Sequence, residues 1–124
     1  MNNTFTQLGN MQLQKIETRI QKIKEELLTI GEMRPGSISK QYNVCGNPNC
    51  RCKDKQNPQK HGPYYQLSYV HQGKSSSQFI RQEFLAEAKK QLANYKHFKK
   101  LVDQWIDLAL QHAKLTLELA KKQR

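Results

Sequence analysis

Residues 45–52 are Cys45-Gly-Asn-Pro-Asn-Cys50-Arg-Cys52, and residues 61–65 are His61-Gly-Pro-Tyr-Tyr. These two motifs decide how the middle of the chain folds. All three cysteines of the 124-residue sequence lie here, and the Gly, Pro and Asn between them favour turns. Three thiolates and one imidazole are a usual tetrahedral set for structural Zn²⁺. The sequence therefore predicts a zinc ion held by Cys45, Cys50, Cys52 and His61, in place of a hydrophobic core.

Several alternatives remain open for this cluster. His71 and Asp54 are rivals to His61 as fourth ligand, because zinc accepts imidazole and carboxylate donors. A thiolate-rich site also suits iron, and three free thiols are compatible with a reducing compartment, whereas three cysteines cannot all form disulfides. Four protein ligands leave no open position for a reactive water, and no carboxylate cluster or nucleophile–base pair is evident. We therefore expect a structural metal, no catalytic residues and no enzymatic activity.

Positive charge is concentrated in the middle of the chain. Of a formal net charge of +11, residues 34–100 hold thirteen bases against three acids, a net +10. Such a block on a small domain is the footprint of a nucleic-acid-binding protein, although a solvated surface has the same composition. The residues expected to contact phosphate are Arg51, Lys53, Lys55, Lys60, Lys74, Arg81, Lys89, Lys90 and Lys96, with Lys99 and Lys100 beside them.

A heptad repeat predicts a helix over residues 11–31. Its apolar residues alternate three and four positions apart, which places them on one stripe. Gly31 and the following Pro35-Gly36 end the helix, and residues 1–10 are expected to be flexible. The stripe consists of Leu13, Ile16, Ile20, Ile23, Leu27 and Ile30.

A second, long helix is predicted over residues 82–124, which contain neither Pro nor Gly. Its apolar residues form one stripe at first and then spread around the circumference, as expected for a helix with more than one neighbour. An antiparallel pairing of residues 11–30 with residues 98–120 would bury one side. Trp105 either fills that core or joins an interface with a second copy or a larger protein. The predicted interface residues are Ile16, Ile20, Ile23, Leu27, Trp105, Ile106 and Leu110.

Between the helices, residues 32–81 are predicted to form a zinc-stapled β module. Alternation indicates strands over residues 37–44, 64–70 and 74–81, with Gln72-Gly73 as a two-residue turn, so the module is a hairpin or a three-stranded unit. Tyr65 and Tyr69 share a face with Leu67 and are assigned to the core. Tyr64 lies on the other face, where a ring can stack on an unpaired base. The predicted fold class is α+β, mainly α.

The polar strand Ser75-Ser-Ser-Gln78 has two interpretations of equal weight. Its hydroxyl groups can donate hydrogen bonds to phosphates without base preference, or the strand is an ordinary solvent-facing edge.

No run of eighteen apolar residues is present, so the sequence predicts no membrane span. No secretory signal is recognisable either, and we expect a cytoplasmic protein with neither a membrane nor a small-molecule substrate as partner.

Four motifs resemble those of a family of small prokaryotic proteins described as a domain of unknown function, some of which are associated with transposons and other mobile elements. The resemblance covers residues 33 to about 100. It implies that the three cysteines and His61 belong to one motif, and it favours DNA or RNA as partner without supplying an activity. The motifs are Met33-Arg-Pro-Gly-Ser-Ile-Ser, Gln41-Tyr-Asn-Val-Cys-Gly-Asn-Pro-Asn-Cys-Arg-Cys, His61-Gly-Pro-Tyr-Tyr-Gln-Leu-Ser-Tyr and Ala93-Asn-Tyr-Lys.

The sequence thus favours a zinc-binding protein that contacts the phosphate backbone of nucleic acid, as an accessory factor of a mobile element. DNA and RNA, duplex and single strand, are all compatible with it. The alternative is an adaptor that dimerises or docks on a partner through its helical seam, without nucleic acid.

Overall fold

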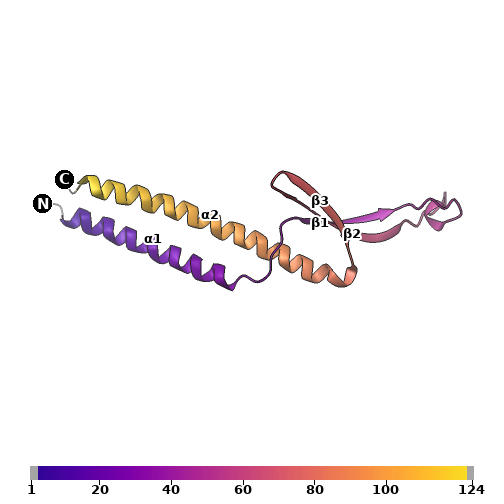
Figure 1. Cartoon of the computed structure of the whole chain (residues 1–124), viewed down its shortest axis with the longest axis horizontal. Helices are drawn as coiled ribbons and strands as arrows, with labels where there is room; N and C mark the ends of the chain where they lie inside the picture. The colour runs from indigo at the N-terminus through magenta and orange to yellow at the C-terminus, as the bar shows by residue number, and fades with distance from the viewer. Residues whose placement is uncertain (1–2, 123–124) are drawn as a thin grey trace. The chain divides into compact units, whose positions relative to one another are not determined.

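A computed structural model describes residues 3–122 as a helix, a three-stranded antiparallel sheet and a second, long helix. The predicted α+β, mainly α fold is confirmed (Figure 1). The chain forms two compact units, Met1–Gly31 with Lys96–Arg124, and Glu32–Tyr95. The elements are α1 (Asn3–Thr29), β1 (Ser37–Asn43), β2 (His61–His71), β3 (Lys74–Ile80) and α2 (Leu85–Lys122), with short 3-10 helices at Arg51–Lys53 and Gln82–Phe84.

The first unit is the predicted antiparallel helical hairpin. Figure 1 shows α1 running beside the C-terminal part of α2. Ile23 of α1 and Leu101 and Leu108 of α2 form its buried core, because the heptad stripe of α1 meets an apolar stripe of α2. The partly buried residues packed against this core are Ile16, Ile20, Leu27, Ile30 and Trp105.

This packing involves most of the residues that the sequence assigned to an intermolecular interface. Most of the apolar residues assigned to it lie within the chain's own core, since α2 itself covers the stripe of α1. Lys24 Nζ lies 5.1 Å from the centroid of the Trp105 ring, which also ties that ring to α1. Ile106 and Leu110 differ, because they remain 51% and 65% exposed.

Polar contacts also join the two helices of this unit. His97 Nε2 lies 3.0 Å from Glu26 Oε1, and His112 Nε2 lies 3.0 Å from Glu17 Oε1. Neither histidine had an obvious acidic partner in the sequence, because each partner is on the other helix.

Residues 3–10, which the sequence assigned to a flexible N-terminus, form the first turns of α1. Residues 1 and 2 lie outside the described part of the chain. Gly9 in this segment is buried, and a Cβ atom there would lie 2.5 Å from Leu119 Cδ2. Glycine therefore allows α1 to approach α2 closely at this point.

The second unit is built on the sheet, whose strand order is β1-β2-β3 with both pairs antiparallel. Leu67, in the middle of the central strand, is 2% exposed. Gln91 and Tyr95 of α2 line the same cavity as Leu67 and Tyr69, so the first part of α2 covers this face of the sheet. The assignment of Tyr65 and Tyr69 to the face of Leu67 fits the strand register, and both rings are half-buried.

The turn between β2 and β3 has the predicted residues. Gln72 and Gly73 have φ angles of 51° and 77°, and the flanking His71 and Lys74 are paired. Positive φ at both central positions is typical of the type I′ turn, which suits the twist of a hairpin.

The other strand ends differ slightly from the prediction. β1 ends at Asn43 instead of Val44, after an irregularity in the pairing between Gln41 and Asn43. β2 begins at His61, three residues before the predicted start at Tyr64. Within residues 3–122, no helix combines the length and the apolar character that crossing a membrane requires.

Candidate metal centre

The four predicted ligands converge at the end of the β1–β2 pair. Asn43 of β1 pairs with His61 of β2, so Cys45, two residues after Asn43, is close to the imidazole. The intervening loop returns Cys50 and Cys52 to the same place. The four ligand atoms all lie within 4.8 Å of one another.

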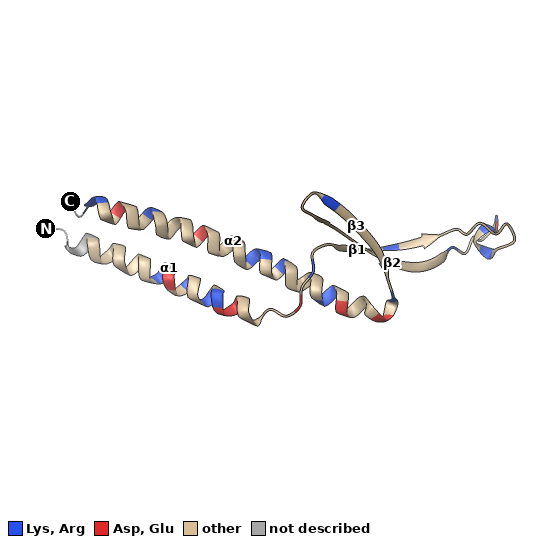
Figure 2. Cartoon of the chain, viewed as in Figure 1, with Lys and Arg blue, Asp and Glu red and all other residues tan. Residues whose placement is uncertain are grey.

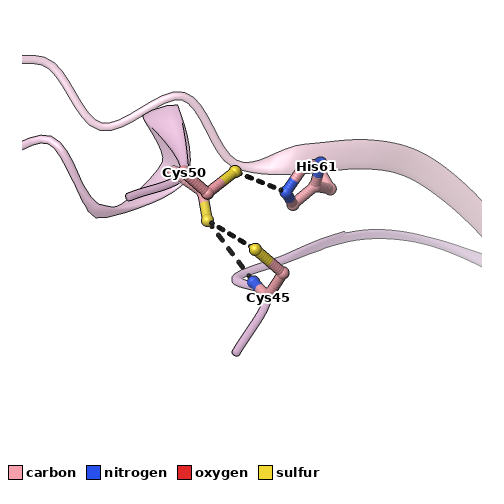
Figure 3. A group of neighbouring side chains, drawn as sticks. Cys45, Cys50 and His61 are labelled. Carbon is pink, nitrogen blue, oxygen red and sulfur yellow. Dashed lines mark hydrogen bonds between the residues drawn. The ribbon is translucent and has the colours of Figure 1, made fainter. Parts of the chain in front are cut away.

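The distances within the cluster suit a tetrahedral ion. The sulfur atoms of Cys45 and Cys52 are 3.6 Å apart, and Cys50 Sγ lies 3.1 Å from His61 Nε2 (Figure 3). Zn–S bonds of about 2.3 Å place two sulfur ligands of a tetrahedron roughly 3.8 Å apart. Only small side-chain shifts would therefore be needed to bind a metal ion, and the residues present fit one.

Turns in the loop set these positions. The backbone N–H of Cys50 donates to the carbonyl oxygen of Asn47 at 3.2 Å, and the Asn47 side chain accepts the N–H of Asn49 at 3.0 Å. The N–H of Lys53 then donates to the Cys50 carbonyl at 2.9 Å within the 3-10 turn. These local bonds fold the chain back between the cysteines, as the Gly, Pro and Asn content predicted.

Hydrogen bonding and burial shift the pKa values of two of the thiols in opposite directions. Hydrogen bonding from the Cys52 backbone, followed by that from the Cys45 and Cys52 side chains, lowers the pKa of Cys50 to about 6. Burial raises the pKa of Cys52, whose side chain is 3% exposed. The Cys52 sulfur also accepts the backbone N–H of Cys45 at 3.4 Å. A thiolate at Cys50 is the form that binds a metal.

Gly62 is a part of the site that sequence reasoning missed. Its φ is +135°, and a Cβ atom would lie 2.7 Å from the carbonyl oxygen of Gln41 and 3.0 Å from Tyr42 Cδ1. A larger residue therefore conflicts with both the backbone conformation and the neighbouring strand. The available signal was the glycine that follows His61 in the second motif.

The two rival ligands lie elsewhere. His71 is at the opposite end of β2 from His61, paired with Lys74. The carboxylate of Asp54 accepts the backbone N–H of Gln56 at 3.1 Å. The geometry of the described residues thus brings His61, and neither rival, into the cluster.

The predicted phosphate contacts are distributed over several elements, and all of them are exposed. Figure 2 shows basic segments along the loop between β1 and β2. Tyr64 is 42% exposed on β2. Lys74 and Arg81 flank β3, Lys89 and Lys90 lie on the part of α2 in the sheet unit, and Lys96 begins the α2 segment of the helical unit. The members on the loop are Arg51, Lys53, Lys55 and Lys60.

Fold and site together define a class of small α+β protein that carries a Cys₃His cluster able to hold a metal ion. A family model described as a domain of unknown function, DUF6788, matches residues 13–90. The chain belongs to this family, which confirms the resemblance to such a domain. The match includes the sheet, the whole Cys₃His cluster and the beginning of α2. Neither the curated proteins nor the solved structures contain a significant match to the chain.

Proposed function

We propose that the protein is a non-catalytic, zinc-binding module that binds nucleic acid through the phosphate backbone. The observation that carries the proposal is the charge around the candidate metal centre. Residues 33–82 contain eight bases and a single acid, Asp54. Such an excess attracts a polyanion and releases its counterions on binding.

Zinc is the metal we propose because of the donor set and of what the loop lacks. Three thiolates and an imidazole form one of its usual structural sets. Within residues 44–60, Cys52 is the only buried residue, so the loop has no apolar core of its own. Binding energy from the ion would stabilise the loop instead and fix the positions of its cations.

The exposed cations on the loop can reach a partner. Arg51 and Lys53 lie on the 3-10 helix that contains Cys52, Lys55 lies in the bend that follows, and Lys60 immediately precedes His61. Contacts of this kind orient a protein on nucleic acid but carry little sequence information. The further proposal of an accessory role in a mobile element is supported by the family resemblance alone.

Fluorescence anisotropy across a salt series tests the proposal with metal-loaded protein and labelled DNA and RNA. We expect the logarithm of the affinity to fall linearly with the logarithm of the salt concentration. Replacing Arg51, Lys53 and Lys55 by glutamine should reduce the slope by about 2–3 on duplex DNA, since each phosphate contact contributes about 0.9. Flat titrations for every nucleic acid would refute the proposal.

A matched control comes from the other unit. Lys15, Lys22 and Lys114 are exposed lysines of the helical hairpin, and their replacement by glutamine removes the same charge. We expect a smaller change of slope for this variant than for the loop variant. Equal changes would indicate non-specific attraction to the whole chain and not binding by the sheet unit.

A second candidate function, as a protein-interaction adaptor, is supported by apolar residues left exposed on α2. Ile106, Leu110 and Leu117 are 51%, 65% and 58% exposed, and their spacing places them on one helical face. Light scattering after size exclusion tests self-association. A dimer that dissociates when these three residues are replaced by glutamine would support the adaptor. A monomer at high concentration would count against self-association.

A further inference from the structure

One face of the sheet is open and differs in chemistry from the charged loop. Strand pairing places Tyr64 opposite Gln41 and Gln66 opposite Phe79, and Ser68 lies between Ser37 and Ser77. Directly opposed residues share a face, and that face is the reverse of the one that carries buried Leu67. We call it the aromatic–amide face. Its members are Ser37, Ser39, Gln41, Tyr64, Gln66, Ser68, Val70, Ser75, Ser77 and Phe79.

Apart from Val70, the side chains of this face are uncharged hydrogen-bonding groups and aromatic rings. The hydroxyl groups of Ser68 and Ser77 lie 2.9 Å apart, and the Gln41 side-chain amide donates to that of Gln66. No aspartate or glutamate is present in any of the three strands. The face can therefore donate and accept hydrogen bonds without repelling an anion.

Tyr64 and Phe79 form an exposed pair of rings on this face. Their centroids are 6.2 Å apart with an interplanar angle of 71°, an edge-to-face arrangement. They are 42% and 58% exposed, so neither ring is used to fill the core on the other side of the sheet. The edge of one ring covers part of a face of the other in such a pair, and the exposed remainder of the two rings can stack on a planar ligand.

A hollow of about 350 Å³ lies beside the pair. Its lining includes Tyr64, Phe79 and Arg81, so a cation borders the rings, and Glu83 lies on the same rim. A planar ring of a ligand bound here would contact the aromatic side chains. The Arg81 guanidinium group would then lie near the ligand backbone that carries the ring. This arrangement matches a nucleobase attached to a sugar-phosphate chain.

We propose that the aromatic–amide face binds single-stranded nucleic acid, with an unpaired base stacked on the Tyr64 or Phe79 ring and in contact with the other, and the adjacent phosphates paired with Arg81 and the loop cations. The inference deepens the proposed function and depends on it. A duplex keeps its bases stacked on one another, so rings on a sheet surface gain little from it. An unpaired base offers a free π-face to the rings and its edge to the Ser and Gln side chains.

The test compares three ligands of equal length on the metal-loaded full chain: a single strand, the matched duplex and an abasic single strand. The abasic strand keeps the phosphates and removes the bases. We expect the intact single strand to bind most tightly. Tyr64→Ala or Phe79→Ala should weaken its binding about 5- to 150-fold, with little change in the salt slope.

Two further variants serve as controls for the rings. Tyr64→Phe keeps the ring and should retain binding to the single strand. Phe84→Ala removes another exposed phenyl group, 55% exposed and outside the aromatic–amide face, and should bind like the unaltered protein. Circular dichroism and metal content establish that each variant is folded.

Photocrosslinking to a single strand containing iodouracil, followed by peptide mapping, tests the same contact in the unaltered protein. A crosslink at Tyr64 or Phe79 would support the inference. Equal affinity for the intact and the abasic strand, unaffected by loss of both rings, would overturn it while leaving the phosphate-binding function intact. The absence of binding to any nucleic acid, or binding to a neutral oligosaccharide alone, would overturn both.

Discussion

At the scale of single residues, two kinds of side chain define the tip of the sheet unit. The cysteines and His61 supply donor atoms within 4.8 Å of one another. Gly62 supplies a backbone conformation, because its φ of +135° and the nearby Gln41 carbonyl leave no room for a side chain. The first contribution is chemical and the second steric, and each leads to a separate prediction.

The identity of the fourth ligand can be tested by metal analysis of purified variants. We expect Cys50→Ser and His61→Ala to lose the bound metal, since each removes a donor from the cluster. His71→Ala should keep the metal of the unaltered protein, because His71 lies at the other end of β2. Loss of metal from the His71 variant, with retention by the His61 variant, would contradict the ligand assignment.

A pair of glycine variants tests the positive-φ backbone next to the site. Gly62→Ala should lower the free energy of unfolding by about 1–3 kcal/mol, because alanine is disfavoured at this φ and its Cβ meets backbone atoms. Gly46→Ala is the control, since a Cβ there has no atom within 4 Å. Denaturant titrations of both metal-loaded variants give the comparison, and equal stabilities would show that the close approach is absent in solution.

At the scale of elements, periodicity decides what each segment buries. The stripe of α1 repeats every three or four residues, so its apolar side chains meet Leu101 and Leu108 on one side. The strands alternate with a period of two, which separates buried Leu67 from exposed Tyr64 and Phe79. The same chain thus uses two periods to make one helical core and one two-faced sheet.

Two leucines of α2 test the helical core. Leu101 is 3% exposed and belongs to the core, so Leu101→Ala should destabilise the hairpin by about 2–5 kcal/mol. Leu110 is 65% exposed, and Leu110→Ala should change stability by no more than about 0.5 kcal/mol. Thermal unfolding followed by circular dichroism measures both. A large loss for Leu110 instead would indicate that this residue is covered, as in the adaptor.

At the scale of the whole molecule, the two units differ in how much of each has a buried core. Both contain buried apolar residues, Ile23, Leu101 and Leu108 in the helical unit and Leu67, Ala88 and Leu92 in the sheet unit, but the loop of the sheet unit has one buried residue between positions 44 and 60. Net charge is shared almost equally, because residues 32–95 hold ten bases and four acids and the helical unit holds eleven bases and six acids. The two units therefore differ in how they are stabilised and not in their net charge.

Removal of the metal should accordingly affect the units unequally. We expect a strong chelator to abolish amide-exchange protection in the loop of residues 45–61, while the core of α1 and α2 around Ile23 and Leu108 stays protected. Hydrogen exchange with mass spectrometry, before and after chelation and after restoring zinc, measures this directly. Uniform loss of protection in both units, or none in the loop, would contradict a local structural metal.

Much of this architecture could be predicted from the sequence, because local chemistry carries it. The spacing of the donor residues predicted the cluster of Cys45, Cys50, Cys52 and His61. The heptad stripe predicted the helical hairpin, and Gln72-Gly73 predicted the turn between β2 and β3. These features depend on neighbours close in sequence or on a repeated period. The period of two along the strand likewise predicted that Tyr64 and Leu67 lie on opposite faces of the sheet.

Tertiary structure alone decided the features that depend on distant segments. Gly9 of α1 approaches Leu119 of α2 closely, and Gly62 is required because a strand about twenty residues earlier in the chain passes beside it. Trp105 is placed in the chain's own core by α1, and Phe79 meets Tyr64 only through the register of β2 and β3. Composition and period determine what a segment can bury, whereas the partner that covers it is fixed only when the chain folds.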